Sequence, residues 1–307
     1  MSDSSITEVR TGRFNNIDAL KTVCAFLIVC IHAPFPGVAG EYFTALSRIA
    51  VPIFFMITGY LYPSVVQRGG QIQQIKKILK LFLMGNVIYL GWDLVTAIMN
   101  HDFETFISSF TLKNFGIFLI FNESMWGGHL WYLGAILYVL IIVYLADKFH
   151  FQKLLNILIP VFLICDLLFG KYSLLIWGKE FPVYCVRNFL FVGLPNFCIG
   201  RMVHSEFGSR IKSRSLVAMT AVFFSVTTLL ERYILIIVGM NATRDHYIST
   251  TFLAVSVFLL STRINTKEGA LSVIGCKYST WLYILHPIFI TAFTVVTRAV
   301  GLYNYYS

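Results

Sequence analysis

Charged residues are scarce in this chain of 307 residues: Asp, Glu, Lys and Arg together make up 13% of it, whereas hydrophobic residues make up 57%. The mean hydropathy is +0.73. So few polar side chains cannot cover the surface of a water-soluble globule, which excludes a soluble enzyme or a soluble binding domain. A polytopic protein of the cell membrane, surrounded by membrane lipid, is predicted instead.

Three further absences narrow the class. None of the six cysteines belongs to a CxxC pair, so neither a metal site nor a disulfide framework is expected. The first long apolar run ends in Pro-Phe-Pro-Gly without a small-residue cleavage site, which predicts a retained helix and not a cleaved signal peptide. The net charge of +9 comes mainly from short loops between apolar segments, so nucleic-acid binding is not expected.

Long apolar segments recur along the whole chain and predict an all-α bundle of transmembrane helices. A segment of about 20 apolar residues is long enough to cross a bilayer. The segment 105–122 is apolar only in its second half and is predicted to be re-entrant or interfacial, so about nine to ten spans are expected. The nine predicted spans are 17–35, 42–62, 75–98, 129–146, 153–170, 186–204, 215–239, 246–262 and 277–297.

Lysine and arginine gather in alternate loops, which predicts that those loops and the N-terminus are cytoplasmic. Residues 1–16 are then a cytoplasmic N-terminal segment, and 17–307 form a single membrane domain with no soluble domain or linker. The basic residues that mark the cytoplasmic side are Arg10, Arg13, Arg68, Lys76, Lys77, Lys80, Lys148, Lys153, Arg201, Arg210, Lys212, Arg214, Arg263 and Lys267.

Three ionisable residues, Asp18, Lys21 and His32, interrupt the first predicted helix. An α-helix turns by about 100° per residue, so the step from Lys21 to His32 returns to within about 20° of the same face. The rise of about 1.5 Å per residue separates these two side chains by about 16 Å along the axis. One stripe of the helix therefore joins a cation at the predicted inner end to an imidazole nearer the outer end.

Further polar residues fall toward the predicted outer side of other spans. An ionisable group in hydrocarbon costs roughly 2.5 kcal/mol or more, so several at similar depth favour a shared water-filled or ligand-filled pocket. Any one of them taken alone could instead snorkel to the interface or cap a neighbouring helix. The predicted pocket residues are Arg48, His129, Trp131, Tyr132, Arg187, Asn188, Glu231, Tyr283 and His286.

Two prolines are predicted to kink the helices that carry some of these residues. Proline lacks the backbone N–H that would bond the carbonyl four residues earlier. Pro52 should therefore release the carbonyl of Arg48, and Pro287 should release that of Tyr283.

Six motifs follow one another in an order that resembles acyltransferase family 3. They are IDALK followed after ten residues by His32, then SRIAVPIFFMITGYLY, KKILK, HLWYLGAILY, VRNFLFVGLPNFCIGRMV and STWLYILHPIFI. The likeness spans nearly the whole chain and is closest to the membrane domain fused to vancomycin-resistance-type serine racemases. It implies an O-acyltransferase of the bacterial inner membrane. Such an enzyme moves an acyl group, usually acetyl, from cytoplasmic acetyl-CoA or another acyl-CoA to a hydroxyl of an extracytoplasmic glycan, as in polysaccharide modification of the cell envelope.

The resemblance also implies roles for individual residues. His32 is expected to be the general base that takes the proton of the acceptor hydroxyl. Lys21, in the family's arginine position, is expected to act at the donor end, where Asp18 one turn away orients it. The basic run before the third span is expected to attract the CoA phosphates, and it consists of Lys76, Lys77 and Lys80.

The sequence departs from the family pattern in three places. Lysine replaces arginine at Lys21 and also at the basic pair that ends in Lys80, and lysine lacks the planar bidentate fork of arginine. The family commonly has one more helix after the span that contains His286 and Pro287. The domain is therefore expected to lack that last helix, as a shortened or truncated member.

The racemase-linked branch implies a second function, the binding or transport of L-serine. Arg48 and Arg187 would then pair with the carboxylate, and Glu231 would receive the ammonium group. The basic run before the third span separates the two hypotheses, because transport of a small zwitterion does not require it. An inactive sensor or scaffold is a third interpretation, and the sequence does not indicate an oligomeric state.

Overall fold

The computed structural model describes residues 14–205, 210–211, 213–264 and 267–301 of the chain. Within these ranges helices alternate with short connections, and no β-strand is present. The helices are α1 (Asn15–His32), α2 (Gly37–Ser47), α3 (Ala50–Gln67), α4 (Gln71–Met99), α5 (Phe103–Ser108), α6 (Leu112–Phe121), η1 (Gly128–Leu130), α7 (Trp131–Lys148), α8 (Gln152–Phe169), α9 (Ser173–Trp177), α10 (Val183–Val186), η2 (Phe189–Gly193), α11 (Leu194–His204), α13 (Arg214–Ile237), α14 (Ile248–Arg263), α15 (Ala270–Lys277) and α16 (Ser279–Ala299). The predicted all-α membrane bundle is confirmed.

Eight helical segments of the described chain are long and apolar enough to cross a membrane, with α2 and α3 counted together. The predicted span without a counterpart among these eight is 246–262, which corresponds to α14, a helix of 16 residues. At about 1.5 Å per residue its length is about 24 Å, somewhat less than a bilayer core of about 30 Å. α14 packs against α13, α3 and α1, so it belongs to the bundle whether or not it spans alone.

The segment 105–122 forms two short helices, α5 and α6, and not one long helix. Side chains of the preceding residues cap both of them: Asp102 accepts from the backbone N–H of Thr105, and Thr111 accepts from that of Asn114. α6 has 10 residues and is too short to span a bilayer. The expectation that this segment does not cross as a full helix is confirmed.

The second predicted span, 42–62, is interrupted and not merely kinked. α2 ends at Ser47 and α3 begins at Ala50, so Pro52 lies in the first turn of a new helix. Proline is tolerated there because its missing N–H would have had no helical partner. The prediction of a continuous helix kinked by Pro52 is therefore wrong. The interruption leaves Arg48 at a helix end, where a polar side chain can reach out of the bundle.

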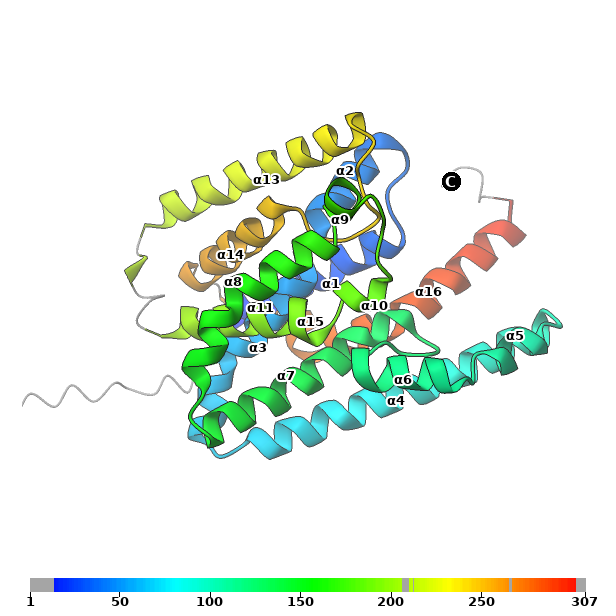
Figure 1. Ribbon diagram of the computed structural model, residues 1–307. Helices are drawn as coiled ribbons and strands as arrows, with labels where there is room; N and C mark the ends of the chain where they lie inside the picture. The colour runs from blue at the N-terminus through cyan, green and yellow to red at the C-terminus, as the bar shows by residue number, and fades with distance from the viewer. Residues whose placement is uncertain (1–13, 206–209, 212, 265–266, 302–307) are drawn as a thin grey trace, which may run out of the picture.

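The helix ends form two groups at opposite ends of the bundle. The turns between α3 and α4 and between α7 and α8 lie at one end, together with the start of α13 (Figure 1). The α2 region, α9 and the far end of α16 lie at the other (Figure 1). We refer to the first as the predicted cytoplasmic end and to the second as the predicted outer end, because the basic loops of the sequence fall in the first group.

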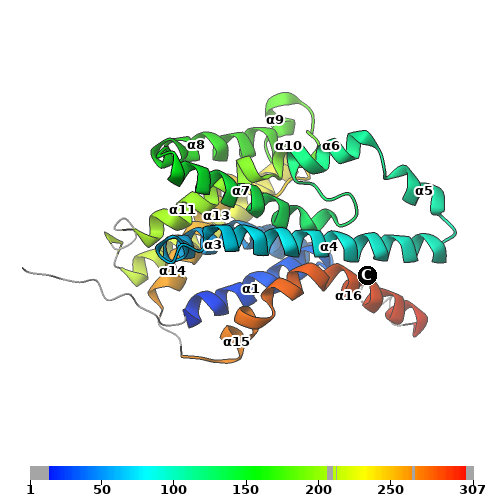
Figure 2. The same cartoon turned by 90° about the horizontal axis from the view of Figure 1, so that it is seen from below.

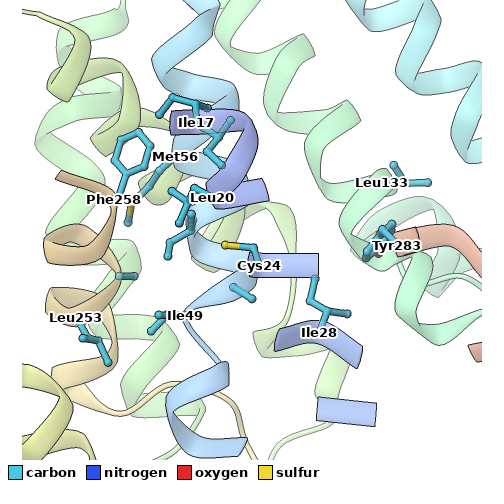
Figure 3. Packing of buried hydrophobic residues seen from close by; sticks show 14 of the residues in the cluster. Ile17, Leu20, Cys24, Ile28, Ile49, Met56, Leu133, Leu253, Phe258 and Tyr283 are labelled. Atoms are coloured by element: carbon cyan, nitrogen blue, oxygen red, sulfur yellow. The ribbon is translucent and has the colours of Figure 1, made fainter. Parts of the chain in front are cut away.

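The hydrophobic core is arranged around α1. This helix contacts α3, α14, α15 and α16, and it runs beside α16 in the view from below (Figure 2). Its buried residues Ile17, Leu20, Cys24 and Ile28 belong to the same core cluster as Met56 and Phe258 of the neighbouring helices (Figure 3). α1 is therefore held on several sides, which fixes the polar residues on its remaining face.

Two glycines allow α3 and α11 to approach each other closely. A Cβ added to Gly59 would lie 1.9 Å from the carbonyl oxygen of Phe197. One added to Gly200 would lie 2.0 Å from the carbonyl oxygen of Met56. Small residues at helix crossings are a common means of bringing backbones together in membranes.

Candidate functional site

A large cleft opens between the end of α1, the turn that leads into α2, and one face of α16. Its volume is about 1190 Å³, and most of its lining is apolar, including Phe289 and Phe293. Two imidazoles, His32 and His286, line this apolar space, and Glu41 lies at its edge. We call it the histidine cleft. Because it lies at the predicted outer end, a ligand could enter it from that side or from the bilayer.

Three histidine rings from three different elements gather at the cleft. The ring centroids of His32 and His286 are 4.9 Å apart, and those of His129 and His286 are 5.2 Å apart. His32 is exposed to the cleft, whereas His129 and His286 are buried. They meet because three elements reach the same level of the bundle: His32 ends α1, His129 lies in η1 just before α7, and His286 lies within α16.

Pro287 fixes the orientation of His286. Since Pro287 has no N–H, the carbonyl of Tyr283 lacks its usual helical partner, and His286 Nδ1 lies 2.8 Å from that carbonyl oxygen. A carbonyl has no proton to give, so Nδ1–H is assigned as the donor. The other nitrogen, Nε2, is buried and has no hydrogen-bond partner among the residues that the structure describes. In the neutral ring this Nε2 is a free proton acceptor.

His129 is held through its other ring nitrogen. Its Nε2 lies 3.1 Å from the carbonyl oxygen of Ile284, which assigns Nε2–H as the donor. The hydroxyl of Tyr89 donates to the same carbonyl at 2.8 Å. The hydroxyl of Tyr283 donates to the backbone carbonyl of His129. These bonds tie α4 and η1 to α16 at the level of the histidines.

A second pocket, of about 260 Å³, is lined on one side by the rings of Tyr132 and Tyr283. Lys21 of α1 and Lys77 of α4 both line it, and so does Cys276 of α15. We call it the lysine pocket. Its polar lining also includes Thr58, Gln74, Ser279, Thr280, Tyr132 and Tyr283.

Tyr283 and His286 separate the two pockets. Tyr283 lines the lysine pocket and His286 lines the histidine cleft, and their ring centroids are 6.2 Å apart. Residues three apart on a helix lie on nearly the same face, with a rise of about 4.5 Å between them. The two pockets therefore approach each other to within about one helical turn of α16.

The family of the chain follows from a comparison with known protein families. The model of the acyltransferase domain matches residues 14–304, nearly the entire chain. The chain belongs to this acyltransferase family. No solved structure matches it.

Two racemases are similar to this acyltransferase-family chain. It is 26% identical over 298 residues to a serine/alanine racemase of Enterococcus gallinarum, an alignment that covers 88% of the chain and 40% of the racemase. It is 29% identical over 131 residues to an amino-acid racemase of Enterococcus faecalis, covering 40% of the chain and 18% of that protein. The chain thus spans less than half the length of the racemases it matches.

The donor-side residues predicted for the acyltransferase are only partly brought together. Lys21 Nζ donates to Asp18 Oδ1 at 2.9 Å, the contact that their spacing predicts. Of the three lysines before the third span, Lys77 lines the lysine pocket, whereas Lys76 and Lys80 are exposed on α4 outside it. The helical step of about 100° turns Lys76 away from the face of Lys77, and Lys80 lies nearly one turn further along α4.

The residues predicted for a single outer pocket are distributed over three places. His286 lines the histidine cleft, and Tyr132 and Tyr283 line the lysine pocket. Arg48 lines a third pocket of about 240 Å³, which we call the arginine pocket because Arg232 and Arg244 also line it. The sequence could not separate these sites, because depth along a helix does not determine which neighbouring helix a side chain faces.

Four of the predicted residues take part in contacts that stabilise the fold. Asn188 Oδ1 accepts from the backbone N–H groups of Leu190 and Phe191 and so caps η2. Both oxygens of Glu231 are occupied, one by the hydroxyl of Tyr172 and the other by Ser249. The guanidinium of Arg187 lies 5.8 Å from the ring centroid of Trp131, a cation–π contact that both residues share.

Asp245 was not predicted, although it joins two of the predicted arginines. Its carboxylate oxygens lie 2.6 Å from Arg48 Nη1 and 3.3 Å from Arg187 Nε. Burial alone would raise the pKa of Asp245, but Arg48 and Arg187 hold it well below its usual range. The signal in the sequence was the ionisable triplet Arg-Asp-His at 244–246 in a chain so poor in charge.

Lys171 and Glu123 were also missed. Lys171 is buried in the short connection after α8, and burial lowers its pKa to about 8. Glu123 lies in the loop before α7, where burial raises its pKa to about 7 despite the nearby charge of Arg187. Among the described residues, no group of three or more His, Cys, Asp or Glu side chains could hold a metal ion.

Proposed function

We propose that this protein transfers an acyl group from a cytoplasmic acyl-CoA to a hydroxyl group presented on the outer side of the membrane. The observation that carries the proposal is the approach of the lysine pocket and the histidine cleft at Tyr283 and His286 of α16. An acyl group held on one side would need to move only about one helical turn to reach a hydroxyl on the other. Membership of the acyltransferase family supports the reaction class.

The donor would occupy the lysine pocket. Lys21 and Lys77 place two ammonium groups at this pocket, and ammonium groups attract the phosphates of CoA. The offset of about 16 Å along α1 between Lys21 and His32 is comparable to a pantetheine arm that carries the thioester toward the histidines. Tyr132 and Tyr283, whose ring centroids are 5.3 Å apart, both line this pocket and would flank the thioester.

The acceptor would enter the histidine cleft, where neutral His32 accepts the proton of its hydroxyl as the oxygen attacks the thioester carbonyl. The new C–O bond replaces the C–S bond, and the proton passes from the imidazole to the departing CoA thiolate. His286 supports this role, because its ring centroid lies 4.9 Å from that of His32 and its Nε2 has no hydrogen-bond partner among the described residues. A glycan of the cell envelope is the acceptor class that the family resemblance implies.

The proposal is tested with purified protein reconstituted into proteoliposomes, radiolabelled acetyl-CoA and an envelope extract as the acceptor source. Replacing His32 with Gln keeps a polar side chain of similar reach but removes the proton acceptor, so transfer should fall by about 10²–10⁴-fold. Lys21→Arg should retain or increase transfer, because guanidinium offers paired donors to a phosphate. Lys77→Gln should weaken acetyl-CoA binding.

His101→Asn is the matched control for the histidine substitution. His101 is exposed in the turn after α4, outside both pockets, and its φ of 55° is one that Asn tolerates. This variant should transfer acyl groups at the parental rate. Parental transfer by His32→Gln, with unchanged behaviour in size-exclusion chromatography, would refute the mechanism.

A second candidate function, recognition of L-serine or a related amino acid, is favoured by the similarity to two amino-acid racemases. Arg48 and Arg187 could bind a carboxylate group, although both already contact Asp245. Tight binding of L-serine by a parent protein that neither hydrolyses nor transfers from acetyl-CoA would favour this candidate over acyl transfer.

A further inference from the structure

The arginine pocket contains more cationic than anionic side chains. Four cations line it, and the two acidic residues that line it, Glu41 and Asp245, are both already paired. Glu41 accepts from Arg232, and Asp245 pairs with Arg48. The four cations are Arg48, Lys171, Arg232 and Arg244. A small pocket with this surplus of positive charge attracts anions.

Lys171 is the least compensated of these cations. The residue is 5% exposed, and its Nζ donates to the backbone carbonyl of Ala242 at 2.7 Å. Nζ also lies 4.6 Å from the ring centroid of Tyr247. Within the part of the chain that the structure describes, no carboxylate oxygen lies within ion-pair distance of Lys171 Nζ. A buried ammonium without a carboxylate partner is costly, so the binding of an anion beside Lys171 would be favourable.

The neighbouring carboxylates do not provide a site for an ammonium group. Glu231 is fully occupied by Tyr172 and Ser249, as described above. Glu180 accepts from the backbone N–H and the hydroxyl of Thr243 and lies 3.2 Å from Arg244. The pocket therefore offers donors for an anion but no free carboxylate for the cationic half of a zwitterion.

The arginine pocket adjoins the histidine cleft through one residue. Glu41 lines both of them, and its carboxylate is tied to Arg232. A ligand that spans this shared edge could present a hydroxyl group to His32 while a second group lies in the arginine pocket. The two pockets are thus arranged as subsites for one acceptor.

We propose that the arginine pocket binds an oxyanion, a carboxylate or phosphate group carried by the acyl acceptor, with Lys171 as its principal cation. The inference rests on the proposed acyl transfer for the identity of the ligand, but the oxyanion site itself does not depend on that activity. It predicts that acidic glycans are preferred to neutral ones as acceptors.

The test measures direct binding without any acyl donor, so that failure of the oxyanion site and failure of acyl transfer are distinguishable. The purified protein is titrated at constant ionic strength with D-glucuronate, glucose 1-phosphate, D-glucose and L-serine, and the ligand-dependent rise of the unfolding temperature gives each Kd. Either acidic sugar should bind at least 10-fold more tightly than glucose. The tighter of the two identifies carboxylate or phosphate as the source of the oxyanion.

Two variants test the site itself. Lys171→Met removes the ammonium group and keeps the apolar stem, and it should weaken oxyanion binding by about 10-fold or more. Asn241→Asp keeps the size of a residue that lines the pocket and adds a fixed negative charge, so it should weaken binding as well. This second variant keeps the test decisive if Lys171→Met does not fold.

Lys179→Met is the matched control, because Lys179 is an exposed lysine of the next loop that does not line the pocket. It should leave every Kd unchanged. Equal binding of glucose and the acidic sugars would overturn the proposal, as would oxyanion binding that neither pocket variant weakens. Binding of L-serine with no binding of either acidic sugar would also overturn it, and would identify an amino-acid site.

Discussion

At the scale of single residues, the sequence identified the histidines and the Asp18–Lys21 pair but missed Lys171, Glu123 and Asp245. Histidine and charge within an apolar span are conspicuous, because each such group is expensive there. The missed residues lie in connecting loops, where ionisable side chains are ordinary. Only the folded chain buries them, so their abnormal surroundings could not be predicted from the sequence.

Glu123 should make the protein less stable as the pH rises. Burial raises its pKa to about 7 from an ordinary 4.5, so between these values the folded state holds a proton that the unfolded state has lost. The free energy of unfolding therefore decreases as the pH rises from 4.5 through 7. Glu123→Gln should remove this decrease and add about 1–2 kcal/mol at pH 8, with little effect at pH 4.5.

Thermal unfolding in detergent at several pH values measures this effect. Glu104→Gln is the matched control, because Glu104 is exposed in α5. It should leave the pH dependence as in the parent. An unaltered pH dependence in Glu123→Gln would contradict the assignment.

Lys171 predicts a second pH dependence, that of oxyanion binding. Because its pKa is lowered to about 8 by burial, the ammonium form predominates below pH 8 and disappears above it. Binding of an acidic sugar should therefore be strongest below pH 8 and weaken above it, and the change should be absent in Lys171→Met. The charged groups that also act on this lysine are Asp245, Arg48, Arg232 and Glu180.

At the scale of elements, hydrophobic periodicity predicted the helices but not the break between α2 and α3. Apolar residues continue across Arg48 and Ile49, so nothing in the local pattern marks an end there. Both helices contact α1, but α2 also packs with α13 whereas α3 packs with α11 and α14, and these different partners separate the two helices. Tertiary packing of this kind overrides local propensity.

The crossing of α3 and α11 should tolerate no side chain at Gly59. The added methyl of Gly59→Ala would lie 1.9 Å from the carbonyl oxygen of Phe197, so the helices must separate. We expect a loss of about 1–3 kcal/mol or more in the free energy of unfolding. Gly91→Ala on α4 adds the same methyl where no atom lies within 4 Å and should be neutral or slightly stabilising. Equal unfolding temperatures of the two variants would contradict the conclusion that α3 and α11 cross closely at Gly59.

At the scale of the whole molecule, the sequence predicted the class of fold and the family, and it predicted a single outer cavity where the structure has separate pockets. The orientation in the membrane stays a prediction that rests on the basic loops. Under the proposed function, this orientation decides whether the lysine pocket faces the side that holds acyl-CoA.

Cysteine labelling tests the orientation in intact cells. In a variant without the natural cysteines, Gln67→Cys lies just before the exposed turn between α3 and α4, and Asn100→Cys lies at the other end of α4. Only Asn100→Cys should react with an impermeant maleimide added outside. Reaction of Gln67→Cys under the same conditions would reverse the topology and move the lysine pocket to the outer side.

The rings of Tyr283 and His286, which lie between the lysine pocket and the histidine cleft, bear on whether the membrane stays closed to ions. Tyr283 is 7% exposed, and its hydroxyl donates to the backbone carbonyl of His129 in η1, so a hydrogen-bonded side chain stands between the lysine pocket and the histidine cleft. In the proposed reaction the two ligands meet beside Tyr283, and neither pocket has to open to the opposite side of the membrane. Acyl transfer of this kind would leave the membrane closed to protons, which is the condition for keeping a proton gradient across it.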